Sequence, residues 1–97
     1  MPKAYWIVHI DVHDPQRYDA YRKAVGAPLA AFGAKFVVRG GPAETREGQQ
    51  RARTVVIEFP TLADARACYD SAAYQAAKAL RDDVATADLT IVEGWEA

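Results

Sequence analysis

One histidine lies where the sequence pattern would let it do acid–base chemistry. The segment from residue 4 to residue 12 alternates, which is typical of a strand whose two faces differ. One face carries Trp6, Val8, Ile10 and Val12, and the other carries Tyr5, Ile7, His9 and Asp11. An imidazole changes its charge near neutral pH, so His9 is a candidate catalytic acid or base. The alternative is a structural histidine that forms a hydrogen bond within a protein interface.

Two glutamates are candidates for a shared role with His9. Glu58 and Glu93 lie late in the predicted strands 53–59 and 89–95, which should flank the first strand on either side. Two sheet spacings would separate them by roughly 9–10 Å, which is too far for the two carboxyl groups to share a proton. We take Glu58 as a candidate catalytic group and Glu93 as a candidate ligand-binding group. The alternative is that each pairs with an arginine, and Arg39 would face Glu58 if the connecting hairpin turns symmetrically.

Three more side chains are candidate ligand-binding groups. Arg39 could hold an anion or a carbonyl group of a ligand. Tyr5 shares a face with His9, and Tyr74 could direct its hydroxyl into a cleft. The alternative for Tyr74, as for Tyr69 and Trp95, is a place in the core or in an interface.

The sequence indicates no metal site and no cofactor. Cys68 is the single cysteine, so neither an intrachain disulfide nor a Cys-rich zinc site can form. It lies in a predicted helix with no histidine nearby, so we expect a buried, unreactive thiol. His9 and His13 are too separated to form a metal-binding pair. No helix begins after Gly40 and Gly41, so a bulge or tight bend is expected there rather than a phosphate-binding loop.

Length and charge exclude several classes of protein. Ninety-seven residues are enough for one domain, which we expect to span residues 1–97. Twelve basic and thirteen acidic residues give a net charge of -1, without the clustered positive charge of a nucleic-acid-binding protein. No segment approaches the roughly 18 apolar residues of a membrane span, and the N-terminal residues lack a signal-peptide pattern. We therefore expect a cytoplasmic protein that binds neither nucleic acids nor membranes.

The pattern of apolar and capping residues predicts the order β-α-β-β-α-β. Asp14 and Thr61 are predicted to cap helices, and Ser71 is predicted to start a fresh helical turn. A break or kink is expected at Gly26 and Pro28. The predicted strands are 4–12, 35–39, 53–59 and 89–95, and an apolar stripe of Tyr74, Ala77, Leu80 and Val84 is expected in the second helical region.

This order predicts an α+β fold with one covered and one bare sheet face. The split β-α-β arrangement gives a four-stranded antiparallel sheet in the order four-one-three-two, with both helical regions on one side. The other face would present roughly 400 Å², more apolar surface than a monomer usually leaves exposed. Its expected apolar residues are Tyr5, Ile7, Val37, Val56, Leu89 and Ile91. A second copy of the chain is the simplest cover, so we expect a homodimer.

Short motifs follow one another in order along nearly the whole chain. The motifs are Asp14-Pro15-Gln16-Arg17-Tyr18-Asp19-Ala20-Tyr21, Val38-Arg39-Gly40-Gly41, Glu47-Gly48, Val56-Ile57-Glu58-Phe59-Pro60, Tyr69-Asp70-Ser71 with Tyr74-Gln75, Arg81 and Glu93-Gly94. This ordered set resembles the domain-of-unknown-function family 1330. The resemblance implies a ferredoxin-like fold of the dimeric α/β-barrel group. Two departures are Gln49-Gln50, where the family often has a tryptophan, and Ala72-Ala73 before Tyr74, where Pro-Glu is common.

The resemblance implies a fold and dimerisation but no activity, because one fold hosts many functions. The first hypothesis is a homodimeric small-molecule-binding protein that could act as a cofactor-independent enzyme, by proton transfer or oxygenation of a small metabolite. The second is a non-catalytic binding or interaction module with a structural dimer interface. A cavity holding His9 and an unpaired carboxylate would favour the first; a fully paired interface would favour the second. The sequence leaves open whether the protein is an enzyme.

Overall fold

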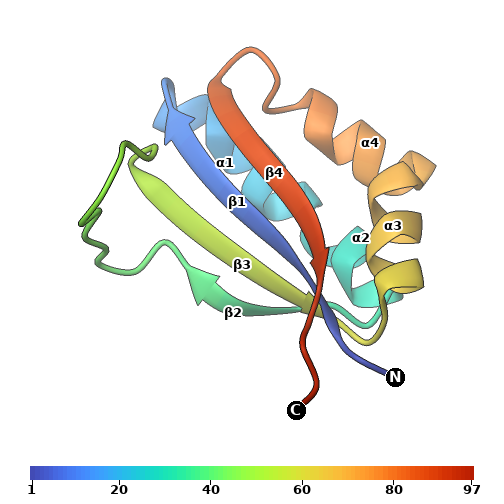
Figure 1. Cartoon of the computed structure of the whole chain (residues 1–97). Helices are drawn as coiled ribbons and strands as arrows, with labels where there is room; N and C mark the ends of the chain where they lie inside the picture. Colours follow the sequence, from blue (N-terminus) through green and yellow to red (C-terminus); the bar gives the residue numbers. More distant parts are fainter.

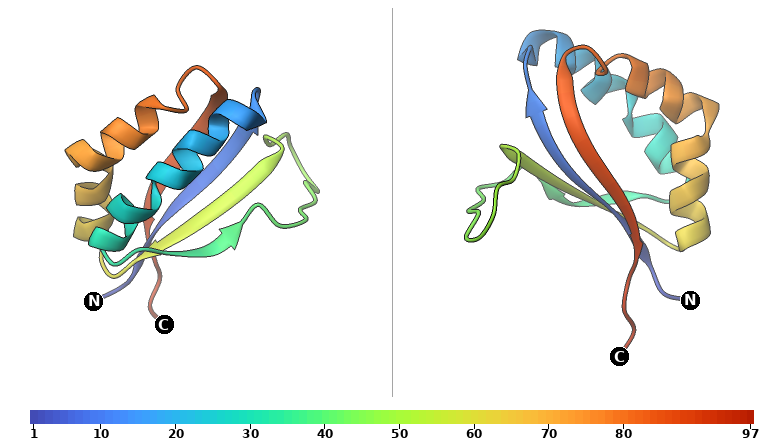
Figure 2. Two further views of the ribbon diagram at one scale, coloured as in Figure 1. Left: turned by 180° about the vertical axis from the view of Figure 1, so that it is seen from behind. Right: turned by 45° about the horizontal axis from the view of Figure 1, so that its top comes forward.

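The computed structural model describes all 97 residues and has two layers, a four-stranded antiparallel sheet and four helices on one of its faces (Figure 1). The elements are β1 (Ala4–Val12), α1 (Pro15–Ala24), α2 (Gly26–Ala31), β2 (Lys35–Arg39), β3 (Arg53–Phe59), α3 (Leu62–Asp70), α4 (Ala72–Ala79) and β4 (Ala85–Glu93). The strand order β2-β3-β1-β4 is the predicted one. Both views in Figure 2 show the helices gathered on one side of the sheet, and the whole chain measures 38 × 36 × 17 Å.

The helices begin at the predicted capping residues. The Asp14 side chain accepts a hydrogen bond from the backbone N–H of Arg17 (3.1 Å), with Pro15 next to it in the first turn. Thr61 accepts from the backbone N–H of Asp64 (3.1 Å). Ser71 ends α3 and caps α4, as its side chain accepts from the third residue of α4 at 3.1 Å. Each cap satisfies an N–H that has no partner within its helix.

The strand register separates the residues of the sheet into two faces. Val8 in β1 lies opposite Val55 in β3 and Leu89 in β4, and all three face the helices. The opposite side, which we call the open face, has no helix over it (Figure 2). The open face consists of Tyr5, Ile7, His9, Asp11, Lys35, Val38, Thr54, Val56, Glu58, Thr86, Asp88, Thr90 and Val92.

The prediction that Leu89 and Ile91 lie on the open face is wrong. They lie opposite Val8 and Trp6, on the side of the helices, and Thr90 and Val92 take their place on the open face. The predicted start of this strand is also wrong, because β4 runs from residue 85 to residue 93. Its first helix-facing residues are alanines, which carry a weak alternation signal.

Two apolar residues, Leu80 and Trp95, are more exposed than the sequence predicts. Helix α4 ends at Ala79, so Leu80 does not continue its apolar stripe and is 45% exposed. The predicted place of Trp95 in the core is also wrong, because this residue lies beyond β4 and is 89% exposed in the single chain. Its alternative, a place in an interface, stays a prediction.

A bulge in β2 changes the predicted partner of Arg39. Phe36 pairs with Ile57 and Val38 pairs with Val56, so Val37 is an extra residue between them. One inserted residue shifts the residues that follow it onto the other face of the sheet relative to a regular strand. Arg39 therefore lies opposite Val55 on the helix side, and Lys35 is the residue opposite Glu58. The predicted Arg39–Glu58 pair is absent.

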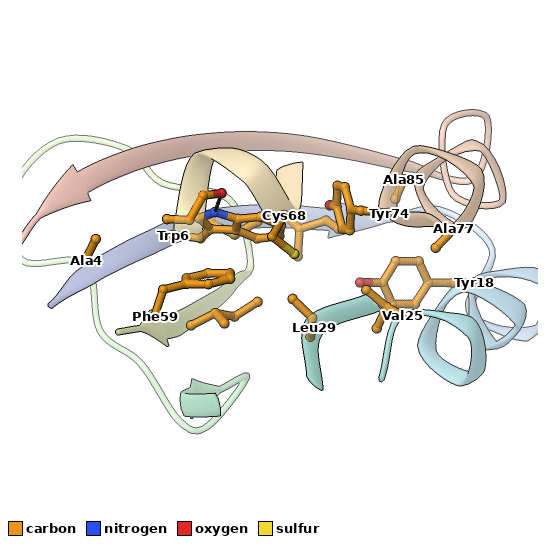
Figure 3. Packing of buried hydrophobic residues seen from close by; sticks show 14 of the residues in the cluster. Ala4, Trp6, Tyr18, Val25, Leu29, Phe59, Cys68, Tyr74, Ala77 and Ala85 are labelled. Atoms are coloured by element: carbon orange, nitrogen blue, oxygen red, sulfur yellow. Dashed lines mark hydrogen bonds between the residues drawn. The ribbon is translucent and has the colours of Figure 1, made fainter. Parts of the chain in front are cut away.

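The core between the two layers is centred on Trp6 (Figure 3). Its indole N–H donates to the backbone carbonyl of Ala65 in α3 (3.0 Å). Its ring lies 4.9 Å from the ring of Phe59 and 4.8 Å from the ring of Tyr74. Tilted and edge-on aromatic contacts of this kind add to the stabilisation gained from burial. Trp6 thus joins β1 to β3, α3 and α4.

No helix combines the length and apolar character needed to cross a membrane.

We expect the thiol of Cys68 to be unreactive in the folded protein. It is fully buried against the backbone carbonyl of Pro28 (3.8 Å), and burial raises the pKa of the thiol to about 11. A thiol–disulfide reagent at about pH 8 should react only after unfolding, because the thiolate is the reactive form. In a matched variant that combines Cys68→Ala with Ala67→Cys, the thiol moves to an exposed position of the same helix and should react at once. Rapid reaction of the native protein would contradict the packing of α3.

Candidate functional site

A partly enclosed cavity of about 50 Å³ lies between the sheet and the helices. Its apolar wall comes from all four strands and from the helical region. The apolar lining residues are Trp6, Val8, Ile10, Val25, Phe36, Val55, Ile57 and Leu89. The polar lining residues are Tyr18, Tyr21, Tyr74, Arg22, Arg39, Arg53 and Arg81. An apolar cavity with a few converging polar groups is the usual form of a small-molecule site.

The four arginines give the cavity a one-sided electrostatic character. No aspartate, glutamate or histidine lines it. Arg22 is exposed and lies 3.7 Å from Asp19 on its own helix. Arg39 is exposed and stacks its guanidinium 4.2 Å from the ring centre of Phe36. Arg39, Arg53 and Arg81 form no ion pair, so positive charge at the cavity is not balanced by the protein.

Arg53 is fixed at the cavity by a glycine. The guanidinium packs against Gly40 so closely that a Cβ at residue 40 would lie 2.6 Å from its Nη2 atom. Gly40 has φ +74°, a conformation that suits glycine. The Nε atom of Arg53 is buried and has no hydrogen-bond partner. The bend that the sequence predicts at Gly40 therefore serves to accommodate this guanidinium.

Two tyrosines and Arg81 form a chain of polar groups at the inner end of the cavity. Arg81 is only 6% exposed, and its Nη2 donates to the hydroxyl of Tyr74 (3.3 Å). The hydroxyls of Tyr74 and Tyr21 lie 3.4 Å apart. Both contacts are longer than the usual hydrogen bond of their type. The hydrogen bonds among Tyr21, Tyr74 and Arg81 are therefore weak, and these groups can still donate to a ligand.

Tyr18 and Tyr21 keep their protons at the cavity. Burial, followed by the nearby Tyr74 hydroxyl, raises the pKa of Tyr21 well above its ordinary value. Burial also raises the pKa of Tyr18, although Arg53 and Arg81 oppose this change. A phenol that keeps its proton acts as a hydrogen-bond donor rather than as a base. The cavity therefore offers N–H and O–H donors and no basic group.

His9 lies on the open face, outside the cavity. Its Nδ1 is 3.1 Å from the hydroxyl of Thr54 on the neighbouring strand. Close by, Arg51 bridges Asp11 (3.0 Å) and Asp88 (2.9 Å). The backbone N–H of residue 52 and then the Arg51 guanidinium hold the pKa of Asp11 below its ordinary value. The charged groups around His9 are thus paired with one another.

Glu58 is also paired on the open face. Its carboxylate lies 3.2 Å from the ammonium of Lys35 and 3.6 Å from that of Lys3, and it accepts a hydrogen bond from Tyr5 (3.2 Å). The hydrogen bond from Lys35 is the main cause that lowers the pKa of Glu58. Glu93 does not share this face, because it lies opposite Ala4, on the helix side of the sheet.

The structure separates the predicted site residues into two groups. Arg39 and Tyr74 line the cavity. Tyr5, His9 and Glu58 lie on the open face, and the exposed Glu93 belongs to neither group. The chemical roles assigned to all six remain predictions.

Three cavity residues did not stand out in the sequence. Arg53 alternates with Val55 and Ile57, which places it on the helix-facing side of β3, so the period of this strand contained a usable signal. Arg81 and Tyr21 carry no such signal. Arg81 follows the end of α4, where an arginine is usually exposed.

We expect Glu58 to contribute stability that is lost in acid. A carboxyl group whose pKa is lowered by folding stabilises the native state above its ordinary pKa, and this contribution disappears as the pH falls from about 4.5 toward the folded value. Glu58→Gln should therefore show a smaller loss of melting temperature than the parent between about pH 5 and pH 3. Glu93→Gln is the matched control, since Glu93 forms no ion pair and should leave the pH profile unchanged. Equal profiles for Glu58→Gln and the parent would contradict the pairing.

Comparison with solved structures places the chain among ferredoxin-like proteins. A protein of unknown function from Rhodopseudomonas palustris, RPA0582, has a TM-score of 0.75 and 17% identity, with coverage of 99% of this chain and 85% of that chain. A dimeric protein of unknown function and ferredoxin-like fold from Bacteroides fragilis has a TM-score of 0.63 and 15% identity, with coverage of 95% and 96%. SnoaB, a cofactor-independent oxygenase from Streptomyces nogalater, has a TM-score of 0.64 and 11% identity, with coverage of 100% and 97%.

These likenesses concern the fold, because the identities are low. No curated protein matches the sequence. The sequence model of one family matches residues 3–95, nearly the whole α+β domain described above. The chain therefore belongs to the family of the domain of unknown function DUF1330, as its motifs predict.

Proposed function

We propose that the chain is a homodimeric protein that binds a small metabolite in the cavity between the sheet and the helices. The observation that carries this proposal is the cavity itself, in which apolar walls enclose hydrogen-bond donors with incomplete partners. Buried donors of this kind are costly unless a ligand or water satisfies them. A closed structural core would not keep them.

The dimensions of the cavity limit the ligand. About 50 Å³ of free space is small compared with the roughly 300 Å³ of a typical drug-sized pocket. A head group of a few atoms fits inside, next to Tyr21, Tyr74 and Arg81. The rest of the ligand would extend toward the exposed Arg22 and Arg39 at the mouth.

Dimerisation through the open face is part of the proposal. Ile7 and Val56 lie side by side on this face and are only partly buried in the single chain. A structural neighbour from Bacteroides fragilis is dimeric, which supports a dimer here. In such a dimer the open-face pairs, including His9 with Thr54, would lie at the interface.

A second candidate function is cofactor-independent catalysis on the bound metabolite. Guanidinium groups and protonated phenols can stabilise negative charge that develops on a ligand oxygen during proton transfer or oxygenation. The fold likeness to SnoaB is consistent with this possibility but extends to the fold alone. Oxygen uptake and exchange of ligand protons with deuterated water would reveal these two activities.

The competing function is a non-catalytic interaction module. Its support is the pairing on the open face, where His9, Asp11 and Glu58 all have partners. A face whose polar groups all have partners within the protein is the one expected of a structural interface. The cavity on the other side of the sheet is the feature that a pure interaction module does not require.

A screen of small metabolites by thermal shift tests the proposed site. We expect a ligand that raises the melting temperature of the parent and of His9→Asn to the same extent. Val55→Phe should lose this response, because the larger ring fills the cavity, at a stability cost of about 1–3 kcal/mol. Its own melting temperature without ligand serves as the reference. A ligand response that Val55→Phe keeps and His9→Asn loses would place the site on the open face, where the sequence predicts a role for His9.

Sedimentation tests the dimer. We expect the parent to sediment as a dimer at micromolar concentration, with an interface of the standard size, above roughly 1,200 Å². Val56→Asp should give a monomer or an unfolded chain, because the dimer would bury an unpaired carboxylate. In an isolated chain Val56 is partly exposed, so the same substitution would cost little.

Leu80→Asp is the matched control for this experiment. Leu80 is 45% exposed on the helical side, away from the open face, and its replacement should leave the dimer intact. A monomeric parent, or a dimeric Val56→Asp variant with an unchanged melting temperature, would contradict the proposed interface.

A further inference from the structure

We propose that the cavity binds an organic weak acid in its ionised form, as a carboxylate, enolate or phenolate on a planar apolar body, and favours its ionisation. This inference rests on the proposed function, since it names the chemical class of the ligand in the same cavity. Its basis is the excess of positive charge among the lining residues, which include four arginines and no acidic side chain.

Arg81 is a buried cation that no acidic side chain contacts. Its guanidinium is charged at every accessible pH, and the residue is 6% exposed. It donates to the hydroxyl of Tyr74 at 3.3 Å and lies 5.3 Å from the ring centre of Tyr21. A buried charge without a counter-charge is costly, and a protein normally supplies a carboxylate close by. The structure places none at this cavity, so an anionic ligand is the missing partner.

Arg53 and Arg39 give the anion a preferred location and shape. The buried Nε of Arg53 lacks an acceptor, and its contact with Gly40 holds the guanidinium in place. The guanidinium of Arg39 lies over the Phe36 ring, 4.2 Å from its centre. Planar guanidinium groups recognise planar oxyanions through paired N–H donors and also stack on rings. A flat ligand with an anionic edge fits both features.

The tyrosines select the ionised form of such a ligand. The hydroxyls of Tyr21 and Tyr74 are 3.4 Å apart, and both can donate to an oxygen placed beside them. An ionised oxygen accepts more donors than a protonated one, and it also gains the attraction of the guanidinium groups. The anion should therefore bind more tightly than the neutral acid.

This preference implies that binding lowers the pKa of the ligand. Each tenfold preference for the anion over the neutral acid lowers the pKa of the bound ligand by one unit. The O–H bond of the acid breaks, its electron pair stays on the oxygen, and the proton passes to water. No histidine or carboxylate lines the cavity to retain that proton.

The proposal is tested with 4-nitrophenol, a flat weak acid whose anion is yellow, and with its neutral methyl ether, 4-nitroanisole. A spectrophotometric pH titration in the presence of excess dimeric protein gives the pKa of the bound phenol. We expect this pKa to fall by at least one unit relative to free 4-nitrophenol, and the ether to bind at least tenfold more weakly than the phenolate.

Replacement of single arginines identifies the source of the effect. Arg81→Met should abolish most of the pKa change while its melting temperature without ligand is retained or raised, because an unpaired buried charge is removed. Arg66→Met is the matched control: Arg66 is exposed on α3 and does not line the cavity, so the same loss of one charge should have no effect. If Arg81→Met does not fold, Arg39→Met at the exposed mouth carries the test and should lose part of the change.

The outcomes separate this inference from the proposed function. If 4-nitroanisole binds as tightly as the phenolate and Val55→Phe blocks both, the cavity is a ligand site and the preference for an anion is refuted. An unchanged pKa in the parent, or equal changes in the parent, Arg81→Met and Arg39→Met, would also refute it. The proposed function is decided independently by the metabolite screen, in which neutral compounds count equally.

Discussion

The contact of Trp6 with both layers is the interaction on which the rest of the molecule depends. The ring lies between Phe59 and Tyr74, and the indole N–H is hydrogen-bonded to α3. These contacts fill one end of the space between sheet and helices with tightly packed aromatic rings. Beside these rings the cavity is also lined by smaller side chains such as Val8 and Val55. The cavity is therefore a consequence of how unevenly bulk is distributed along β1 and β3.

The alternation of β1 gives the protein two unlike surfaces from one strand. The residues that face the helices are apolar and buried, whereas those on the open face include Tyr5, His9 and Asp11, which all have polar partners. The pairs on the open face join neighbouring strands of the same sheet, so they stabilise the sheet as a platform. Unbalanced charge is found on the helix side, at the cavity. The two sides of the sheet thus differ in electrostatics as much as in packing.

Much of the fold could be predicted because local signals agreed with one another. The bounds of β1, β2 and β3 and the caps at Asp14, Thr61 and Ser71 follow from alternation and from side chains that bond to backbone N–H groups. The start of β4 could not be predicted, since alanines at its first helix-facing positions resemble the alanines of the preceding helix.

The candidate site was harder to predict for a geometrical reason. Tyr74 and Arg39 were selected, but the extra residue at Val37 reverses the face of Arg39, and no local signal marks that residue. The sequence also gives no measure of burial for Arg81, which depends on the packing of α4 against the sheet. The alternation of side chains predicts which face each residue takes within a regular strand. It does not predict which strands contain an inserted residue.

The bulge in β2 has a consequence for how proteins of this family can diverge. If β2 paired regularly, with Val37 opposite Val56, the side chain at position 39 would move from the cavity to the open face. Removal of Val37 would instead leave Arg39 opposite Val55. Relatives could therefore exchange a binding charge for an interface charge through the presence or absence of the bulge, without any substitution of the arginine itself. Conservation of an arginine in an alignment column would then say little about its role, and the pairing of the strand before it would say more.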